Sequence, residues 1–145
     1  MEKHINIHPS PLREKTLNFA ARIVELNKYL IHKNEYVLSK QVLRSGTNPG
    51  AMVREATNAE SSADFIHKLA IAQKEIGETL YWLELLHRTN YLTPTEYTSI
   101  NSDAEEIMKM IRSAILTKKK NVAIKTISLI ITIATIISYS YTHNS

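Results

Sequence analysis

The longest amphipathic segment of this 145-residue chain, residues 61–90, constrains the fold more than any other feature. Its apolar residues recur every three or four positions, which places them on one face of a helix. They are Phe65, Leu69, Ala72, Ile76, Leu80, Leu83 and Leu86. Because a helix rises about 1.5 Å per residue, a helix of this length needs partner helices of similar length to bury its apolar face. The segment therefore predicts a bundle of long helices.

Two further helices have recognisable starts. Ser10 and Thr93 are N-cap residues, and each is followed by a proline at the first helical position. Glu96 completes a capping box with Thr93. With the apolar periodicity that follows each start, these signals predict helices over residues 10–32 and 94–118, the second ending in a run of three lysines.

The segment between the first and third helices contains "LRSGTNPGAM", residues 43–52, which by itself is typical of a turn. Gly46 and Gly50 are four residues apart, so in a helix they would share one face and let a neighbouring backbone approach closely. We therefore expect one helix over residues 37–57, with Gly46, Pro49 and Gly50 as helix-packing residues and a kink at Pro49. The alternative is a true break between two short helices.

Composition supports an all-α fold. The chain has only three Gly and four Pro, and it has no Cys, which excludes disulfides and cysteine metal sites. The first residues contain no apolar stretch of the secretory type, so a cytoplasmic location is expected. We expect one antiparallel up-and-down four-helix bundle, residues 1–120, followed by an apolar extension, residues 121–145.

Charge is distributed unevenly along the chain. Residues 1–57 carry a net charge of +4, residues 58–117 carry −4, and residues 118–145 carry +4. The body of the protein is therefore neutral but polarised, which weakens a general argument for nucleic-acid binding from the basic net charge. A head-to-tail contact between the basic half of one copy and the acidic half of another becomes plausible.

Seven basic residues are candidates for contact with nucleic-acid phosphates. They are Arg22, Lys40, Arg44, Arg54, Lys118, Lys119 and Lys120. The alternative is that they provide solubility and ion pairs with the acids of an adjacent subunit, such as Glu75, Glu78 and Glu84. Trp82, beside Tyr81, could stack on a base, but a single Trp in a long bundle helix more often belongs to a core or an interface.

The sequence offers no constellation for catalysis or metal binding. The pairs Asp64 with His67 and Glu84 with His87 have the spacing used in di-iron bundles, but both pairs lie on the same helix and cannot converge on one centre. The chain also lacks a cysteine, a nucleophile elbow and a phosphate-binding loop. We therefore expect a protein that is not an enzyme and needs no cofactor or metal.

Two blocks, "LSKQVLRSGTNPGAMVREA" and "DFIHKLAIAQKEIGETLYWLELL", carry a family resemblance. They resemble the bacterial four-helix-bundle proteins encoded by intervening sequences in large-subunit ribosomal RNA genes, sometimes labelled S23 ribosomal proteins. A related branch is the accessory variability protein of diversity-generating retroelements. The resemblance, over about residues 8–120, implies a ring-shaped homopentamer. In the retroelement branch it also implies nucleic-acid binding and a reverse transcriptase partner, although this chain's neutral body departs from that branch.

The resemblance does not account for residues 122–141, "VAIKTISLIITIATIISYSY". Twenty mostly apolar residues after a lysine cluster, with tyrosines at the far end, are typical of a membrane anchor. Against this, Ser and Thr make insertion less favourable, and the β-branched content also suits a strand. A helix docked on the ring is a third possibility.

Two function hypotheses follow. The first is a ring-shaped adaptor that binds RNA, DNA or a nucleoprotein partner through the basic residues of its first two helices. The second is a structural oligomer without a nucleic-acid role, tethered to a membrane by its C-terminal extension.

Overall fold

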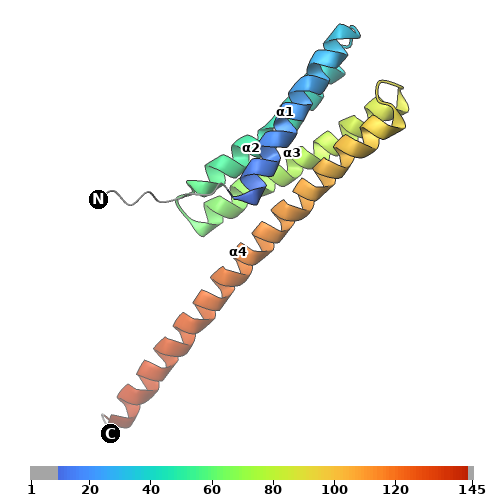
Figure 1. Ribbon diagram of the computed structural model, residues 1–145. Helices are drawn as coiled ribbons and strands as arrows, with labels where there is room; N and C mark the ends of the chain where they lie inside the picture. The colour runs from blue at the N-terminus through green and yellow to red at the C-terminus, as the bar shows by residue number, and fades with distance from the viewer. Residues whose placement is uncertain (1–9, 144–145) are drawn as a thin grey trace, which may run out of the picture.

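The computed structural model describes residues 10–143. Four helices follow one another: α1 (Pro11–His32), α2 (Leu38–Thr57), α3 (Ser62–Arg88) and α4 (Pro94–His143). Short loops join them, and successive helices run in opposite directions (Figure 1). No strand occurs among the residues that the structure describes. The expected all-α, antiparallel up-and-down four-helix bundle is confirmed.

The helices begin where capping side chains satisfy their first N–H groups. Ser10 Oγ accepts a hydrogen bond from the Arg13 amide at 3.2 Å, and Ser61 Oγ accepts one from the Asp64 amide at 3.0 Å. At the start of α4, Glu96 Oε2 accepts from the Thr93 amide at 2.9 Å, as the capping box predicts.

The "LRSGTNPGAM" segment lies inside α2, which continues through Pro49 without a break. A Cβ on Gly46 would lie 2.7 Å from Ile23 Cγ1 of α1, and a Cβ on Gly50 would lie 3.5 Å from the Thr16 carbonyl oxygen. Both glycines therefore face α1, and at Gly46 the approach leaves no room for a side chain. The expected single helix over residues 37–57 is confirmed, and the alternative of two short helices is wrong.

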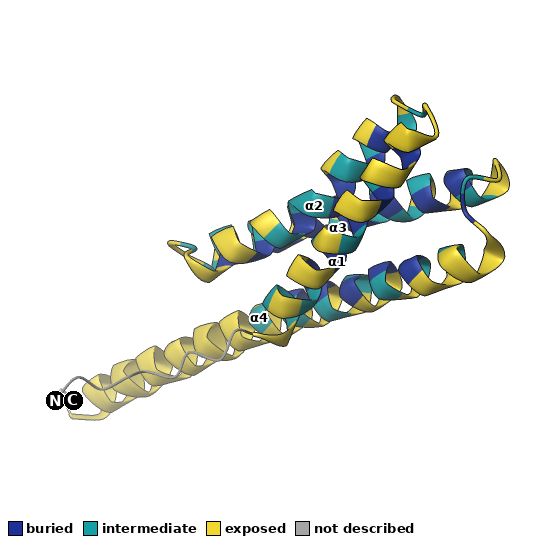
Figure 2. Ribbon diagram, turned by 45° about the horizontal axis from the view of Figure 1, so that its top comes forward, coloured by how far each residue is buried: buried dark blue, intermediate teal, exposed yellow. Residues whose placement is uncertain are grey.

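The core runs along the centre of the bundle and receives apolar side chains from all four helices. α1 contacts α2 extensively and α4 only slightly, whereas α3 packs on both α2 and α4. The fully buried large side chains include Phe19, Ile23, Leu30, Leu69, Ile76, Leu83, Leu86, Ile107 and Ile111. Figure 2 shows this buried layer on the inner faces of the helices.

The expected end of the fourth helix at residue 118 is wrong. α4 is 50 residues long in total and runs to His143. Its last buried residue is Ile115, and every residue from Lys119 to His143 is exposed (Figure 2). The lysine run does not stop the helix, since lysine is a good helix former and no Gly or Pro follows it. We call Lys119–His143 the exposed segment.

Candidate functional site

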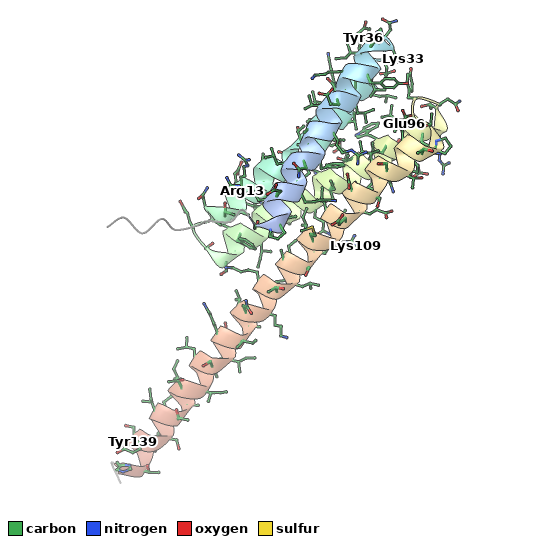
Figure 3. The ribbon with its side chains drawn as sticks, in the orientation of Figure 1. Arg13, Lys33, Tyr36, Glu96, Lys109 and Tyr139 are labelled. Carbon is green, nitrogen blue, oxygen red and sulfur yellow. The ribbon has the colours of Figure 1, made fainter. Side chains whose placement is uncertain are left out.

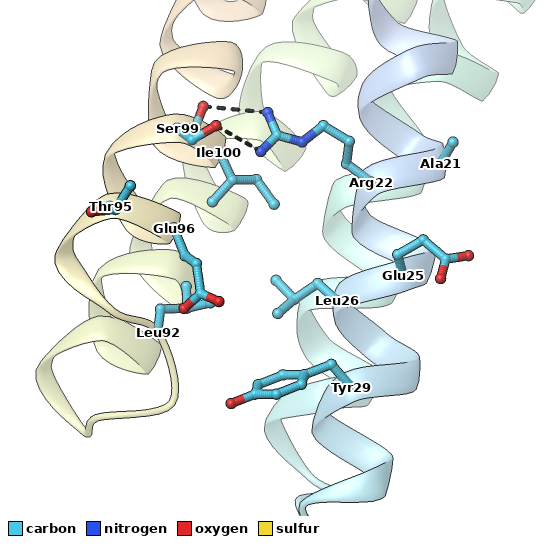
Figure 4. A pocket seen from close by; sticks show the side chains of 10 residues that line it. All are labelled: Ala21, Arg22, Glu25, Leu26, Tyr29, Leu92, Thr95, Glu96, Ser99 and Ile100. Atoms are coloured by element: carbon cyan, nitrogen blue, oxygen red, sulfur yellow. Dashed lines mark hydrogen bonds between the residues drawn. The ribbon is translucent and has the colours of Figure 1, made fainter.

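Arg22, one of the predicted phosphate contacts, is paired with an acid of its own bundle. Its guanidinium forms an ion pair with Asp103 of α4. It also donates to Ser99 Oγ at 2.9 Å (Figure 4). Lys15 also reaches Asp103, at 2.9 Å, and Glu106, at 2.6 Å. Burial alone would raise the pKa of Asp103, but hydrogen bonds from Lys15 and Arg22 outweigh it and lower that pKa. The cluster joins α1 to α4.

Arg44 is paired in the same way between α2 and α3. Its guanidinium lies 3.1 Å from Glu75 Oε2 and forms a second ion pair with Glu78. The Trp82 indole N–H donates to Glu78 at 3.1 Å, and together with Arg44 it lowers the pKa of that carboxyl group. Glu75 and Glu78, which the alternative interpretation assigned to an adjacent subunit, thus pair with Arg44 within one protomer.

Lys40 and Arg54 are the two predicted phosphate contacts of α2 that remain unpaired. Both are exposed, and neither has an ion pair within the described part of the chain, residues 10–143. They are fourteen residues apart on nearly the same side of the helix, about 21 Å along its axis. The structure thus leaves two of the four predicted cations of the first two helices available to an external anion.

A groove of about 730 Å³ lies between α1 and α4, where these helices contact each other least (Figure 4). Leu26, Tyr29 and Ile100 line it, with polar groups at its rim. Two of those polar groups are already engaged, because Arg22 pairs with Asp103 and Glu96 accepts from Thr93. The groove is an apolar contact surface, and its lining contains no nucleophile paired with a base.

His87, from one of the two pairs with di-iron spacing, has a structural role. His87 Nδ1 lies 3.1 Å from the Leu92 carbonyl oxygen, and its ring stacks on Tyr97 with centroids 4.5 Å apart. Across residues 10–143, no group of three or more His, Cys, Asp or Glu side chains is placed to hold a metal ion. Trp82 is half-buried, in edge contact with Tyr81 at 4.8 Å between centroids, and its indole N–H is taken up by Glu78.

The exposed segment is 25 residues of helix, about 37 Å long. Its helix is long and apolar enough to cross a membrane by length and composition, and none of its apolar stretch is buried. Ile and Leu side chains project on all sides, including Ile127, Leu129, Ile130 and Ile136. Figure 3 shows Tyr139 near the far end, well away from the other three helices.

The threonines of the exposed segment satisfy their hydroxyl groups within the helix. Thr126, Thr132 and Thr135 each donate to a backbone carbonyl three or four residues earlier, at 3.0, 2.9 and 2.7 Å. A hydroxyl bonded in this way has no need of a water or protein partner, so its desolvation penalty is reduced. The threonines are therefore a weaker obstacle to membrane insertion than composition alone suggested.

The model of the 23S rRNA-intervening sequence protein family matches residues 11–113. The chain belongs to this family. It is also similar to a crystal structure, at 1.70 Å resolution, of a protein with unknown function from the S23 ribosomal protein family of Bacteroides thetaiotaomicron. The two share 56% identity over 72% of this chain and 97% of that chain, with a TM-score of 0.71. None of the curated proteins compared with this chain matches it.

In this intervening-sequence protein, the family match ends close to the last residue of α4 that is buried in the bundle. The match ends at residue 113, and the last buried side chain is Ile115. The related crystal structure is likewise almost fully covered by 72% of this chain. The exposed segment therefore lies outside what the family match accounts for, and any function that it has must be argued from its own chemistry.

Asp103 is the residue of the α1–α4 cluster that reasoning from sequence missed. It is 81 residues from Arg22 and 88 residues from Lys15, so no local spacing pattern connects them. The only available signal was the opposite charge of the two halves of the chain. That signal gave the correct partners by sign but assigned them to different subunits.

Proposed function

We propose that this protein is a non-catalytic four-helix-bundle module anchored in a membrane by the exposed segment of α4. The single observation that carries the proposal is that all 25 residues of the exposed segment, an uninterrupted stretch of helix, are exposed, with Ile and Leu side chains on nearly every side. A water-soluble domain rarely leaves so large an apolar surface uncovered. A lipid bilayer is a partner that covers all sides of one helix at once.

Dimensions support this proposal. Residues 122–141 form 20 residues of helix, about 30 Å, which equals the hydrocarbon thickness of a typical bilayer. Tyr139 and Tyr141 lie at the far end, where aromatic side chains favour the interface between lipid and water. Lys125 is one turn inside the near end, and its long side chain can extend its ammonium group to the headgroups.

Charge supports one orientation of the bundle. Lys118, Lys119 and Lys120 precede the apolar stretch, and the flank of a membrane span that is rich in Lys and Arg stays in the cytoplasm. The bundle would then be displayed at the cytoplasmic surface of the membrane. This orientation combines the expected cytoplasmic location with the membrane-tethered alternative.

Membrane fractionation tests the anchor. We expect the full chain to sediment with membranes and to resist extraction with alkaline carbonate, and a chain ending at Lys120 to remain in the supernatant. The shortened chain keeps every buried residue of the bundle, so a loss of folding would not explain its release. Release of the full chain by carbonate would contradict the proposal.

A matched pair of lysine substitutions makes the test more specific. Ile130→Lys places a charge near the middle of the span, where it is expensive to bury, and should lower carbonate resistance strongly. Ser140→Lys adds the same charge close to the far end, where the ammonium group can reach water, and should change little. Equal effects of the two variants would argue for surface adsorption instead of a transmembrane helix.

Nucleic-acid binding is a second candidate function, supported by Lys40 and Arg54 on the exposed face of α2. A ring of bundles would repeat these cations around its rim and increase their combined affinity for phosphates. RNA, DNA or a reverse transcriptase would be the partner. A gel shift on structured RNA at low salt tests this role, and K40Q/R54Q should abolish any shift.

The family resemblance also implies a homopentamer. Light scattering of the chain ending at Lys120 tests this oligomeric state.

A further inference from the structure

The stretch of α4 that joins the bundle to the exposed segment carries an unusual concentration of positive charge. After Glu106 the chain has no acidic residue, while six Lys or Arg side chains follow within seventeen positions. They are Lys109, Arg112, Lys118, Lys119, Lys120 and Lys125. This stretch therefore has a net charge of +6 at the point where α4 leaves the bundle (Figure 3, in which Lys109 is labelled).

None of these six cations pairs with an acid among the residues that the structure describes. In contrast, Lys15, Arg22 and Arg44 of the bundle each form at least two ion pairs or hydrogen bonds with groups on another helix. Lys118 lies over the Phe65 ring, 5.0 Å from its centroid, which holds its ammonium group at the edge of the bundle without neutralising it. The positive charge of the stretch is thus available to an external anion.

We infer that Lys118, Lys119, Lys120 and Lys125 form a collar that binds the headgroups of anionic phospholipids. This inference rests on the proposed membrane anchor and names the lipid that the anchored protein prefers. The three consecutive lysines lie about 3 to 6 Å above Val122 along the helix axis. That distance places them within the headgroup layer, which is about 5 to 7 Å thick on each side of the hydrocarbon core.

The arrangement of the collar around the helix favours a membrane over nucleic acid. Lys118 and Lys125 are seven residues apart and share one side of α4. Lys119 and Lys120 follow at steps of about 100° and so point in two other directions. A helix that passes through a lipid surface meets headgroups on every side, whereas a nucleic acid bound along a protein surface needs its cations on one face.

Charge-matched variants of the full chain test the collar. K119Q/K120Q removes two charges from the headgroup layer. K109Q/R112Q removes two charges from exposed positions about 15 to 20 Å from Val122, beyond that layer. All four positions lack ion pairs within residues 10–143, so neither variant should disturb the bundle.

Each full-length chain is synthesised in a cell-free system with vesicles of phosphatidylcholine alone or mixed with phosphatidylglycerol. Vesicles are then floated at low and at high salt and washed with alkaline carbonate. A lysine near an anionic surface contributes about fivefold to partitioning, so K119Q/K120Q should lower the preference for phosphatidylglycerol vesicles about 25-fold at low salt. K109Q/R112Q should lower it much less, and high salt should remove the difference.

The flotation and carbonate readouts separate the failure of this inference from the failure of the anchor. Equal carbonate-resistant flotation of the unchanged chain on both vesicle types would overturn the collar and leave the anchor standing. Absence of carbonate-resistant chain on every vesicle type would overturn the anchor and, with it, the collar. Unchanged lipid preference in K119Q/K120Q would overturn the inference. If the same variant also lost a gel shift on structured RNA, these lysines would be assigned to nucleic-acid binding.

Discussion

The two halves of α4 differ in what surrounds them, although one uninterrupted helix forms both. In the bundle half, five apolar residues at spacings of three or four are buried: Ile100, Ala104, Ile107, Ile111 and Ile115. The residues between them are mostly polar and face water. In the exposed segment, Ile and Leu occur on nearly every side of the helix, and none of them is buried.

The difference shows that the distribution of apolar residues around a helix decides its partner, more than their number does. A single apolar stripe fits the groove between neighbouring helices. A helix that is apolar on all sides cannot be covered by one neighbour, and needs either several helices or lipid. In this protein every residue of the exposed segment is exposed, so none of its side chains is buried by the other helices of the protomer.

Isoleucine-to-alanine substitutions should show the largest difference in stability between the two halves of α4. Ile107 is 0% exposed and Ile130 is 60% exposed. Ile107→Ala leaves a cavity in the core and should lower the free energy of unfolding by about 2–5 kcal/mol. Ile130→Ala should change it by less than about 0.5 kcal/mol. Urea unfolding of the full chain in mild detergent, followed by Trp82 fluorescence, measures both. Similar losses would mean that the exposed segment packs on the bundle.

Two glycine-to-alanine substitutions, one in α2 and one in α3, test how tightly the helices of the bundle pack. The Cβ of Gly46→Ala would lie within 2.9 Å of three atoms of buried Ile23, so overpacking should cost about 1–3 kcal/mol. Gly77→Ala meets only Met108 Cε, at 3.7 Å, and should stabilise the bundle by about 0.5–1 kcal/mol through helix propensity. The same unfolding assay applies. Stabilisation by Gly46→Ala would show that Ile23 moves aside easily.

Most of the bundle could be predicted from sequence because its signals are local. Capping residues and apolar periodicity located the four helix starts to within one residue. The single α2 helix was also predictable, since Gly46 and Gly50 fit a close helix contact better than a turn does. The end of α4 was not predictable in this way. Three consecutive lysines are compatible both with a helix end and with continuation, and only the absence of a later Gly or Pro favoured continuation.

The candidate site was predicted less well, because its geometry depends on contacts between distant parts of the chain. The choice of Arg22 and Arg44 as phosphate contacts rested on their charge alone. The structure instead places Asp103 beside Arg22, and Glu75 and Glu78 beside Arg44. Helix periodicity predicts which face a residue occupies, but it does not predict which acid of another helix lies opposite.

Acid titration should produce an effect confined to the bundle half. Because Lys15 and Arg22 lower the pKa of Asp103 in the folded state, its contribution is present above the unfolded pKa of about 3.9 and is lost as pH falls below it. Asp103→Asn should cost at most about 1 kcal/mol at neutral pH, since these ion pairs are partly exposed. It should also flatten the loss of stability below about pH 4. Unfolding curves between neutral pH and pH 3 measure this slope, and an unchanged slope would assign the acid sensitivity to other carboxylates.

The smallest expected effect concerns a hydroxyl group in the exposed segment. Thr132 donates to the Ser128 carbonyl at 2.9 Å, so its hydroxyl is satisfied within the helix itself. Thr132→Val keeps the shape and removes the hydroxyl, and should change the carbonate-resistant fraction by less than about twofold. Thr132→Asn introduces an amide whose donors and acceptor cannot all bond within the same helix, and should lower that fraction clearly. If Thr132→Val raised insertion as strongly as Thr132→Asn lowered it, the hydroxyl would be unsatisfied in the membrane. The exposed segment would then insert against a larger polar penalty than its hydrogen bonds indicate.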